Sequence, residues 1–396
     1  MTPEQFSDQA PGRLVEATDA LGNRGHAFVP AELPPERDFG ARGLRLALSD
    51  ADQALARLGG MAREIERPDL LFRNFLRREA VLSSKIEGTH TTLADLIMFE
   101  VAPGGDIDDR KDDEIVANYV AAFNYGCDRC TELPIGRRLL SEMHEILMRG
   151  TNAREKTPGV IRDCLVAIGA LPLARARFVP PPDLFVPELL ENLANYIESY
   201  KEPLLVKLAV AHYQFETIHP FRDGNGRLGR LLITLALHRA RLLSGPLLYL
   251  SAYLEQHRDE YYDLLLRVST HGAWDEWIEF FLDGVRTQAL DGIARTTRLA
   301  DLRASYHQKL TGPRTTQNIH RLIDELFKIP AISVPIARDL LEISYPSARA
   351  LIDRLIEVGI LQSKAIVLAG TAYYAADELI HAIDSPIEAE GEHVQQ

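Results

Sequence analysis

The sequence contains few cysteines: Cys127, Cys130 and Cys164 are the three among 396 residues. Three thiols do not provide a disulfide framework. Cys127 and Cys130 form a C-x-x-C pair, but neither a second pair nor histidines stand at the spacing that a zinc site requires. A thioredoxin-like context is missing as well. We therefore interpret the three cysteines as incidental.

Long apolar runs are missing too. No stretch approaches the ~20 apolar residues that cross a membrane. The first residues, M-T-P-E-Q-F-S-D-Q, have neither the basic nor the apolar part of a secretory signal. With 46% hydrophobic and 26% charged residues, the composition is that of an ordinary globular protein. We expect a cytoplasmic protein with no membrane partner.

Positive charge is in deficit, since 44 Lys and Arg face 57 Asp and Glu, for a net charge of −13. A protein that binds nucleic acid through its phosphates needs clustered positive charge. The balance therefore argues against a nucleic-acid surface as the main function. The length is sufficient for two or three domains.

The most informative segment is 219–230, which reads H-P-F-R-D-G-N-G-R-L-G-R and precedes an apolar helical run. Its glycines leave the backbone bare, so N–H groups of the loop can approach a ligand closely. A helix that begins here points its positive end at the same spot. Arginines add charge for phosphate oxygens, a carboxylate offers a ligand for a divalent metal, and a histidine can accept a proton. The pattern predicts a site that transfers a nucleotide phosphate.

This segment differs from the common nucleotide motifs. A Walker loop requires G-x-x-x-x-G-K-[ST], and a dinucleotide fold requires G-x-G-x-x-G between a strand and a helix. Residues 207–217 have helical spacing, so the predicted order is helix, anion-binding loop, helix. The alternative is a Gly-Asn turn whose arginines face water.

The segment matches the signature of the Fic family, H-P-F-x-[DE]-G-N-G-R-x-x-R, at every defined position. The resemblance implies a protein adenylyltransferase, which transfers AMP from ATP to a side-chain hydroxyl of a target protein and releases pyrophosphate. In that interpretation His219 is the base that deprotonates the hydroxyl, and Asp223 binds a Mg²⁺ ion that bridges the phosphates.

The same resemblance implies an ATP site. The residues expected there are Glu87, Gly224, Asn225, Gly226, Arg227, Gly229, Arg230, Gln256 and Tyr261. The amides around Gly224 to Gly226 would hold the α- and β-phosphates, and the two arginines would hold the outer ones. Gln256 and Tyr261 belong to a stretch that resembles the wall around the base, where rings stack on adenine. Aromatic residues at helical spacing are also common in a core.

Residues 83–88 read S-S-K-I-E-G and fit the inhibitory pattern of the family, [ST]-x-x-x-E-[GN], with Ser83, Glu87 and Gly88. In the family this glutamate pairs with the second arginine of the signature, here Arg230, and so blocks the outer phosphate. An arginine that binds a carboxylate cannot also orient a γ-phosphate. The alternative is a solvated helix face.

Residues 158–182 contain short β-branched pieces separated by Gly and Pro, which predicts a hairpin. Fic proteins carry such a flap before the signature, and its edge pairs with the target segment by strand addition. Related sequences often have tryptophan where Ala167 stands here. The alternative is an ordinary surface hairpin.

At the C-terminal end, two amphipathic helical patterns are followed by K-A-I-V-L-A-G-T-A-Y-Y-A, which predicts a two-stranded wing. This resembles a winged helix-turn-helix domain. Over 330–376, four basic residues balance four acidic ones, so we favour a packing or dimerisation role over DNA binding. A homodimer is therefore a possible assembly.

The predicted fold is mainly α: a Fic-type helical bundle with a β-hairpin flap, an N-terminal helical domain and a C-terminal winged helix. The expected N-terminal segment, 1–30, is polar and loosely ordered except where it packs on the body. The other expected parts are a helical domain with the inhibitory motif at 31–113, a catalytic domain at 114–295 with its core at about 134–286, a winged helix-turn-helix domain at 316–380, and a tail at 385–396.

Two functions of different class remain open. The first is an adenylyltransferase restrained by Glu87, with ATP and Mg²⁺ as its small-molecule partners. The second is an ATP-sensing winged-helix regulator with little transfer activity. Within the enzyme class, the signature also allows removal of AMP, or transfer of another phosphate-linked group.

Overall fold

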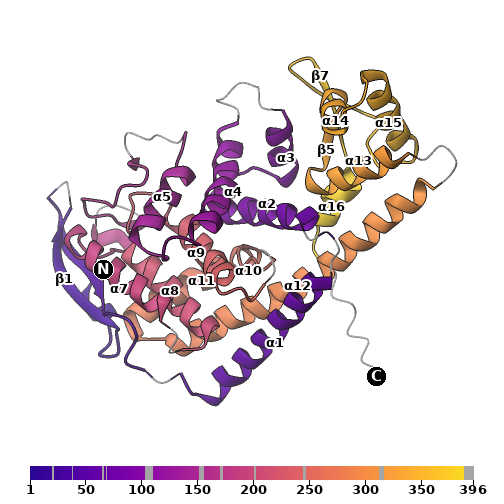
Figure 1. Ribbon diagram of the computed structural model, residues 1–396. Coiled ribbons are helices and arrows are strands. Elements are labelled where there is room, and N and C mark those ends of the chain that lie inside the picture. Colours follow the sequence, from indigo (N-terminus) through magenta and orange to yellow (C-terminus); the bar gives the residue numbers. More distant parts are fainter. Residues whose placement is uncertain are drawn as a thin grey trace.

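The computed structural model describes residues 1–19, 22–37, 39–64, 67, 69–102, 110–150, 156–169, 173–199, 202–243, 247–311 and 316–387 (Figure 1). Helices dominate, and the strands form three small antiparallel sheets. The prediction of a mainly α fold is confirmed. Among the described residues, no helix is long and apolar enough to cross a membrane.

The N-terminal segment forms a two-stranded hairpin. A short 3-10 helix, η1 (Pro3–Gln5), precedes the strands β1 (Gly12–Thr18) and β2 (Arg24–Pro30), which pair in register from Gly12–Pro30 to Thr18–Arg24. We expected order in 1–30 only where the segment packs on the body, and both strands belong to such a packed region. The apolar side chains of β2 are buried, because they pack against the segment that we predicted as a flap.

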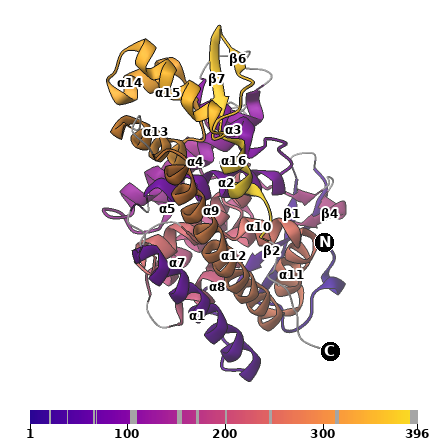
Figure 2. The same cartoon turned by 90° about the vertical axis from the view of Figure 1, so that its right-hand side faces the viewer.

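Three helices follow: α1 (Arg42–Glu64), α2 (Asp69–Ile86) and α3 (Leu93–Val101). α1 lies along the long helix α12 (Trp274–Lys309), as both ribbon views show (Figure 2). α2 is packed against α4 (Lys111–Arg129), α10 (Ser251–Gln256) and α13 (Gln317–Lys328), which come from three other parts of the chain. It is thus the central helix of the N-terminal part.

The middle of the chain is a helical bundle. Its helices are α4 (Lys111–Arg129), α5 (Arg137–Leu147), α7 (Val186–Glu198), α8 (Leu204–Ile218), α9 (Asn225–Arg239), α10 (Ser251–Gln256) and α11 (Arg258–His271). Nearly every residue of α8 and α9 is buried, because both helices carry apolar residues on all faces. The loop between them, 219–224, is therefore fixed at both ends by the core.

The flap is a hairpin of β3 (Ile168–Gly169) and β4 (Ala176–Phe178), with Ile168 opposite Phe178. Two short 3-10 helices, η3 (Leu173–Arg175) and η4 (Asp183–Phe185), flank β4. The predicted flap 158–182 includes residues 170–172, which lie outside the described residues. The N-terminal hairpin supports the flap, since the Phe28 amide donates to the Val179 carbonyl at 2.9 Å and the Phe28 and Phe178 rings are 5.9 Å apart.

The C-terminal elements are α13 (Gln317–Lys328), β5 (Ala331–Ser333), α14 (Val334–Leu341), α15 (Tyr345–Glu357), β6 (Ile366–Leu368), β7 (Thr371–Ala375) and α16 (Asp377–Asp384). The sheet order is β5-β7-β6. We call residues 316–387 the C-terminal module. Its helix pair and two-stranded hairpin occupy the places predicted for them. Of the predicted tail 385–396, residues 388–396 lie outside the described ones.

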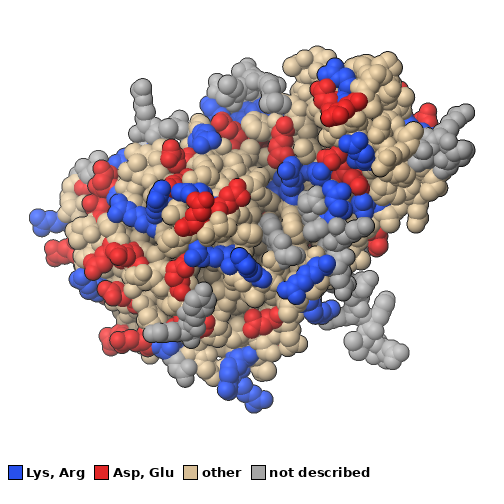
Figure 3. Space-filling view, viewed as in Figure 1, with Lys and Arg blue, Asp and Glu red and all other residues tan. Residues whose placement is uncertain are grey.

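The charged surface of the C-terminal module is balanced. Exposed arginines of α14 and α15 pair with neighbouring carboxylates, Arg338 with Asp339 at 2.6 Å and Arg349 with Asp353 at 2.9 Å. On the face drawn in Figure 3, basic and acidic side chains are interspersed over the whole molecule.

Candidate functional site

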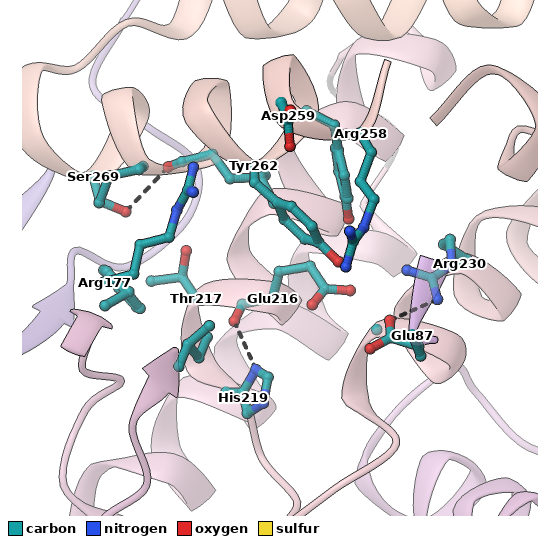
Figure 4. Close-up of a pocket in the computed structure, with 16 residues that line it drawn as sticks. Glu87, Arg177, Glu216, Thr217, His219, Arg230, Arg258, Asp259, Tyr262 and Ser269 are labelled. Atoms are coloured by element: carbon teal, nitrogen blue, oxygen red, sulfur yellow. Dashed lines mark hydrogen bonds and ion pairs between the residues drawn. The ribbon is translucent and has the colours of Figure 1, made fainter. Parts of the chain in front are cut away.

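A cavity of about 420 Å³ opens at the ends of α8 and α9, between the flap and α11. Its wall includes His219 and Gly226 of the signature segment, Arg230 of α9, and Glu87, which follows α2. Figure 4 shows the side chains of Glu87, His219 and Arg230 around one space, although they come from separate parts of the chain. The structure thus brings together residues 87 and 219–230, which the sequence separates by more than a hundred positions.

His219 ends α8 in a left-handed conformation, with φ 48° and ψ 62°, a region in which histidine is one of the better tolerated residues. This turn directs the imidazole into the cavity. Nδ1 lies 3.3 Å from the Glu216 carbonyl oxygen, which can only accept, so Nδ1 carries the proton. Nε2 is then left as the basic nitrogen.

Asn225 closes the loop between α8 and α9. Its side-chain oxygen accepts from the Phe221 amide at 2.9 Å, and its side-chain nitrogen donates to the Phe221 carbonyl at 2.8 Å. Gly224 begins α9 with φ 76°, a conformation that side chains other than glycine rarely adopt. The first amides of α9 therefore have a fixed direction, and such amides bind anions.

The glycines of the signature make room for acidic side chains. A Cβ at Gly226 would clash with Oε1 of Glu87, and a Cβ at Gly229 would clash with Oε1 of Glu216. Gly229 therefore acts through packing, and no contact with ATP is needed to explain its place in the segment.

Arg227 is 6% exposed, yet two of its nitrogens, Nε and Nη1, have no hydrogen-bond partner in the structure. Its nearest carboxylate oxygen, on Asp223, is 4.0 Å away. A buried guanidinium with unused donors is costly unless an anion binds it. Arg227 is thus suited to bind a phosphate.

Arg230 is bound by Ser83 and Glu87. Nε donates to Oγ of Ser83 at 2.8 Å, while Nη2 donates to the Ser83 carbonyl and to Oε1 of Glu87, both at 2.8 Å. Burial opposes the charge of Arg230, but Glu87, together with Tyr261, Tyr262 and Glu216, raises the pKa of the guanidinium overall. Burial likewise raises the pKa of Glu87, but Arg230, with smaller contributions from Arg227 and His219, lowers it overall, so Glu87 is ionised. Gly88, with φ 94°, turns the chain away just after this contact.

Asp223, the predicted magnesium ligand, is 39% exposed and forms an ion pair with Lys156. Burial raises the pKa of Asp223, but Lys156, the Gly224 amide and Arg227 together lower it below its ordinary value, so the carboxylate is ionised. No group of three or more His, Cys, Asp or Glu side chains gathers for a metal among the described residues. A single carboxylate fits Mg²⁺, which commonly binds one or two carboxylates together with substrate phosphates.

The two residues predicted at the adenine base differ. Tyr261 lines the cavity, and its hydroxyl donates to Nε2 of His212 at 2.9 Å. Gln256 is exposed at the end of α10 and is not among the residues that line the cavity. The structure therefore does not bring Gln256 to this site. Ile168, Tyr262 and Leu265 form the apolar wall instead.

Sequence reasoning missed Arg162, which is 2% exposed and binds only carbonyls. Its Nε donates to the His219 carbonyl at 2.8 Å, and Nη2 donates to Ile218 and Pro181. Nη1 donates to Cys164 at 2.8 Å. One side chain thus connects both ends of the flap to the start of the loop 219–224. Burial and then the charge of Arg162 lower the pKa of His219 to about 4.

His144 was missed as well. The Gly159 amide donates to its Nδ1 at 2.8 Å, so Nε2 carries the proton and donates to the Asp223 carbonyl at 2.9 Å. Its ring stacks on Phe221 with centroids 3.8 Å apart. Burial lowers the pKa of His144 to about 4, which keeps the ring neutral in this bridging role.

Glu216 is the third residue missed. It lies between His219 and the Glu87–Arg230 pair (Figure 4), and its Oε1 is buried without a hydrogen-bond partner. Burial raises the pKa of Glu216 to about 8, so the side chain is protonated at neutral pH. The available signal was a carboxylate inside the apolar pattern of α8, because such a residue is expensive to bury and is often functional.

The raised pKa of Glu216 predicts a pH-dependent effect of Glu216→Gln on stability. Between pH 4.5, the ordinary pKa, and about pH 8, Glu216 holds a proton in the folded wild type but not in the unfolded chain. The stability of the wild type therefore falls as the pH rises through this range. The neutral amide lacks this loss. We expect the melting temperature of the variant, relative to wild type, to rise by a few degrees between pH 5 and pH 8 in thermal unfolding. Glu132→Gln, at an exposed glutamate, should show a constant difference; parallel curves for Glu216→Gln would contradict the assignment.

The charge of Arg162 predicts the titration of His219. In Arg162→Gln, two N–H donors remain for the carbonyls but the positive charge is gone, so the pKa of His219 should rise from about 4 by on the order of one unit. NMR titration of the imidazole measures this. Arg222→Gln is the matched control, because Arg222 belongs to the same loop but pairs outward with Asp163 at 2.6 Å. An unchanged His219 pKa in Arg162→Gln would refute the electrostatic role.

Comparison with known proteins adds the family. Residues 45–128 match the Fic/DOC family N-terminal domain, and residues 134–237 match the Fic/DOC family domain. The chain is 34% identical over 111 residues to a probable protein adenylyltransferase of Aquifex aeolicus, which covers 28% of this chain and 32% of that protein. It is 39% identical over 112 residues to the protein adenylyltransferase Fic of Aedes aegypti, covering 26% of this chain and 20% of the relative.

A longer match, 25% identical over 291 residues, joins 71% of this chain to 52% of the protein adenylyltransferase Fic of Drosophila mojavensis. The matches thus cover at most about half the length of these relatives. A crystal structure of a Fic family protein from Desulfovibrio desulfuricans G20 has the same fold, with a TM-score of 0.56 and 22% identity over 87% of this chain and 98% of that one. With both domain matches, the complete signature at 219–230 and this shared fold, the chain belongs to the Fic family.

Proposed function

We propose that this protein transfers AMP from ATP to a side-chain hydroxyl of a target protein, and that Glu87 holds it inactive until the ion pair with Arg230 opens. The observation that carries the proposal is the Glu87–Arg230 ion pair at 2.8 Å. This pair lines the same cavity as His219. The names of the relatives from Aquifex aeolicus and Aedes aegypti, both adenylyltransferases, support the reaction class.

His219 acts as the base. The target hydroxyl gives its proton to Nε2 while its oxygen forms a bond to the α-phosphorus of ATP. The bond from that phosphorus to the bridging oxygen breaks, and pyrophosphate leaves with the electron pair. The left-handed turn at His219 and the bond from Nδ1 to the Glu216 carbonyl support this role, because they direct Nε2 into the cavity.

Phosphate binding follows from the start of α9. The Gly224 amide donates to Oδ1 of Asp223 at 2.7 Å, so the first amides of α9, at Asn225 and Gly226, would hold the phosphates together with the two unused donors of Arg227. Asp223 would hold Mg²⁺, whose charge neutralises phosphate oxygens, after Lys156 releases the carboxylate. Such an arrangement suits phosphoryl-type transfer, which depends mainly on positioning and charge stabilisation.

Inhibition is an exchange of partners at Arg230. Its donors satisfy either Glu87 and Ser83 or the outer phosphate of ATP, and the bound carboxylate excludes a well-oriented phosphate. Because Glu87 is ionised at neutral pH, it also repels the phosphates directly. A Glu87–Arg230 ion pair that never opened would instead support the second candidate, a regulator that senses ATP and transfers little AMP.

The flap is the proposed docking edge for the target. β3 is an edge strand of only two residues, and Ile168 lines the cavity beside His219. Strand addition along this edge would bring a side chain of the target to the imidazole. Arg162 supports this role, because it fixes the flap ends Cys164 and Pro181 relative to the His219 backbone.

Incubation with ATP labelled on the α-phosphate, with Mg²⁺, tests the proposal through self-labelling. We expect weak labelling of wild type and at least about tenfold more in Glu87→Gly, because Arg230 becomes free for the outer phosphate. Adding His219→Ala to Glu87→Gly should lower labelling by about 100-fold or more, the usual contribution of a general base.

Glu132→Gly is the control, because it removes an exposed glutamate in the turn that follows α4, and this residue does not line the cavity. It should label like wild type. Full labelling without His219 would refute the mechanism. Absence of labelling in Glu87→Gly that still binds ATP would favour the sensing regulator.

A further inference from the structure

The helix that precedes Glu87 is also the helix that holds the C-terminal module. Figure 1 shows α2 running from the catalytic bundle to α13 and α16, and these helices pack against it. Thirteen positions separate Asn74 from Glu87, which is about 20 Å along a helix. One rigid element therefore joins the C-terminal module to the cavity.

α2 and the C-terminal module are connected by buried polar contacts at two places, which we call joints. The first joint is at the C-terminal end of α13. The last carbonyls of a helix have no partner within it. Here Nδ2 of Asn74 donates to the Phe327 carbonyl at 2.5 Å, and Nη1 of Arg77 donates to the Lys328 carbonyl at 2.6 Å. Arg77 is 3% exposed and also binds Glu100 of α3 at 2.6 Å. A positive charge at a helix C-terminus is favourable, so this joint is both polar and buried.

A second joint lies at the end of α16. Arg295 of α12 is completely buried, and its Nη1 donates to the Ile383 carbonyl at 2.5 Å and the Ser385 carbonyl at 2.9 Å. Its other donors bind Asp291, whose carboxylate is 3.9 Å from Nη1 of Arg78 on α2. The end of α16 is thereby held against α12 and α2 together.

The opposite face of α2 reaches the cavity. With about 100° per residue, Glu79 and Ser83 lie across the helix from Asn74 and Arg77. Glu79 is buried and accepts from Oγ of Ser251 at 2.5 Å and from Tyr119 at 3.1 Å, and Ser83 binds Arg230. A shift of α2 at the first joint must therefore disturb the contacts of Ser83 and Glu87.

From these joints we infer that the C-terminal module is a regulatory module, which keeps Glu87 in the cavity by holding α2. The inference rests on the proposed function, because it assigns the control of the same site. Displacement of α13 from α2 leaves Asn74 and Arg77 without their carbonyl partners and loosens the helix. Glu87 then leaves Arg230, and the outer phosphate can take its place.

Asn74→Ala and Arg77→Met in the full chain test this, with self-labelling as the readout. Each should raise labelling at least about five-fold over wild type, the lower end of typical coupling between sites. In the Glu87→Gly background neither should raise labelling, because the restraint is already gone. Hydrogen exchange of the amides at 83–88 should become faster in both single variants.

Arg73→Met is the matched control, since it removes a charge from an exposed position of the same helix. It should label like wild type. Asn74→Ala removes only one side-chain amide, so it keeps the test valid if Arg77→Met is unstable. Unchanged labelling and exchange in folded Asn74→Ala, or an equal increase in the Glu87→Gly background, would overturn the inference. If Glu87→Gly itself does not label, the proposed function fails instead.

Discussion

The structure depends on the partner of one buried cation, the guanidinium of Arg230. Arg230 is 2% exposed, and an unpaired charge at such a position would strongly destabilise the fold. The carboxylate of Glu87 and a phosphate oxygen present similar acceptors to the guanidinium. In the proposed function, a phosphate oxygen would replace the carboxylate as the acceptor of Arg230. The guanidinium would then keep a charged partner in both states.

Such an exchange needs a helix that can be held and released. α2 carries Ser83 toward Arg230, and its buried Glu79 binds the first turn of α10 and Tyr119 of α4. Burial raises the pKa of Glu79, and these donors oppose that rise. Nearer its other end, α2 donates hydrogen bonds from Asn74 and Arg77 to the last carbonyls of α13. The helix that precedes the Glu87–Arg230 contact is therefore packed against three parts of the chain, namely α4, α10 and α13.

The sequence was sufficient for features that are local. The glycines, asparagine and histidine of 219–225 act within a few residues of one another, so their spacing alone predicts the loop. Arg162 and His144 act across 57 and 79 positions, through backbone carbonyls that no motif encodes. The N-terminal hairpin escaped notice because glycine and proline dominate its flanks, although R-L-V-E-A-T and H-A-F-V-P carry the strand-forming residues.

The positive charges around His219 serve two purposes at once. Arg162 lowers the pKa of the imidazole, and Arg227 and Arg230 make the cavity attractive to phosphate. Without ligand the histidine is neutral and a weak base. In the proposed function, bound ATP would place several negative charges beside it, and nearby negative charge stabilises the imidazolium form. The pKa of His219 would then rise toward neutrality, where a general base is most effective. The proposed base would thus be strengthened by its own substrate.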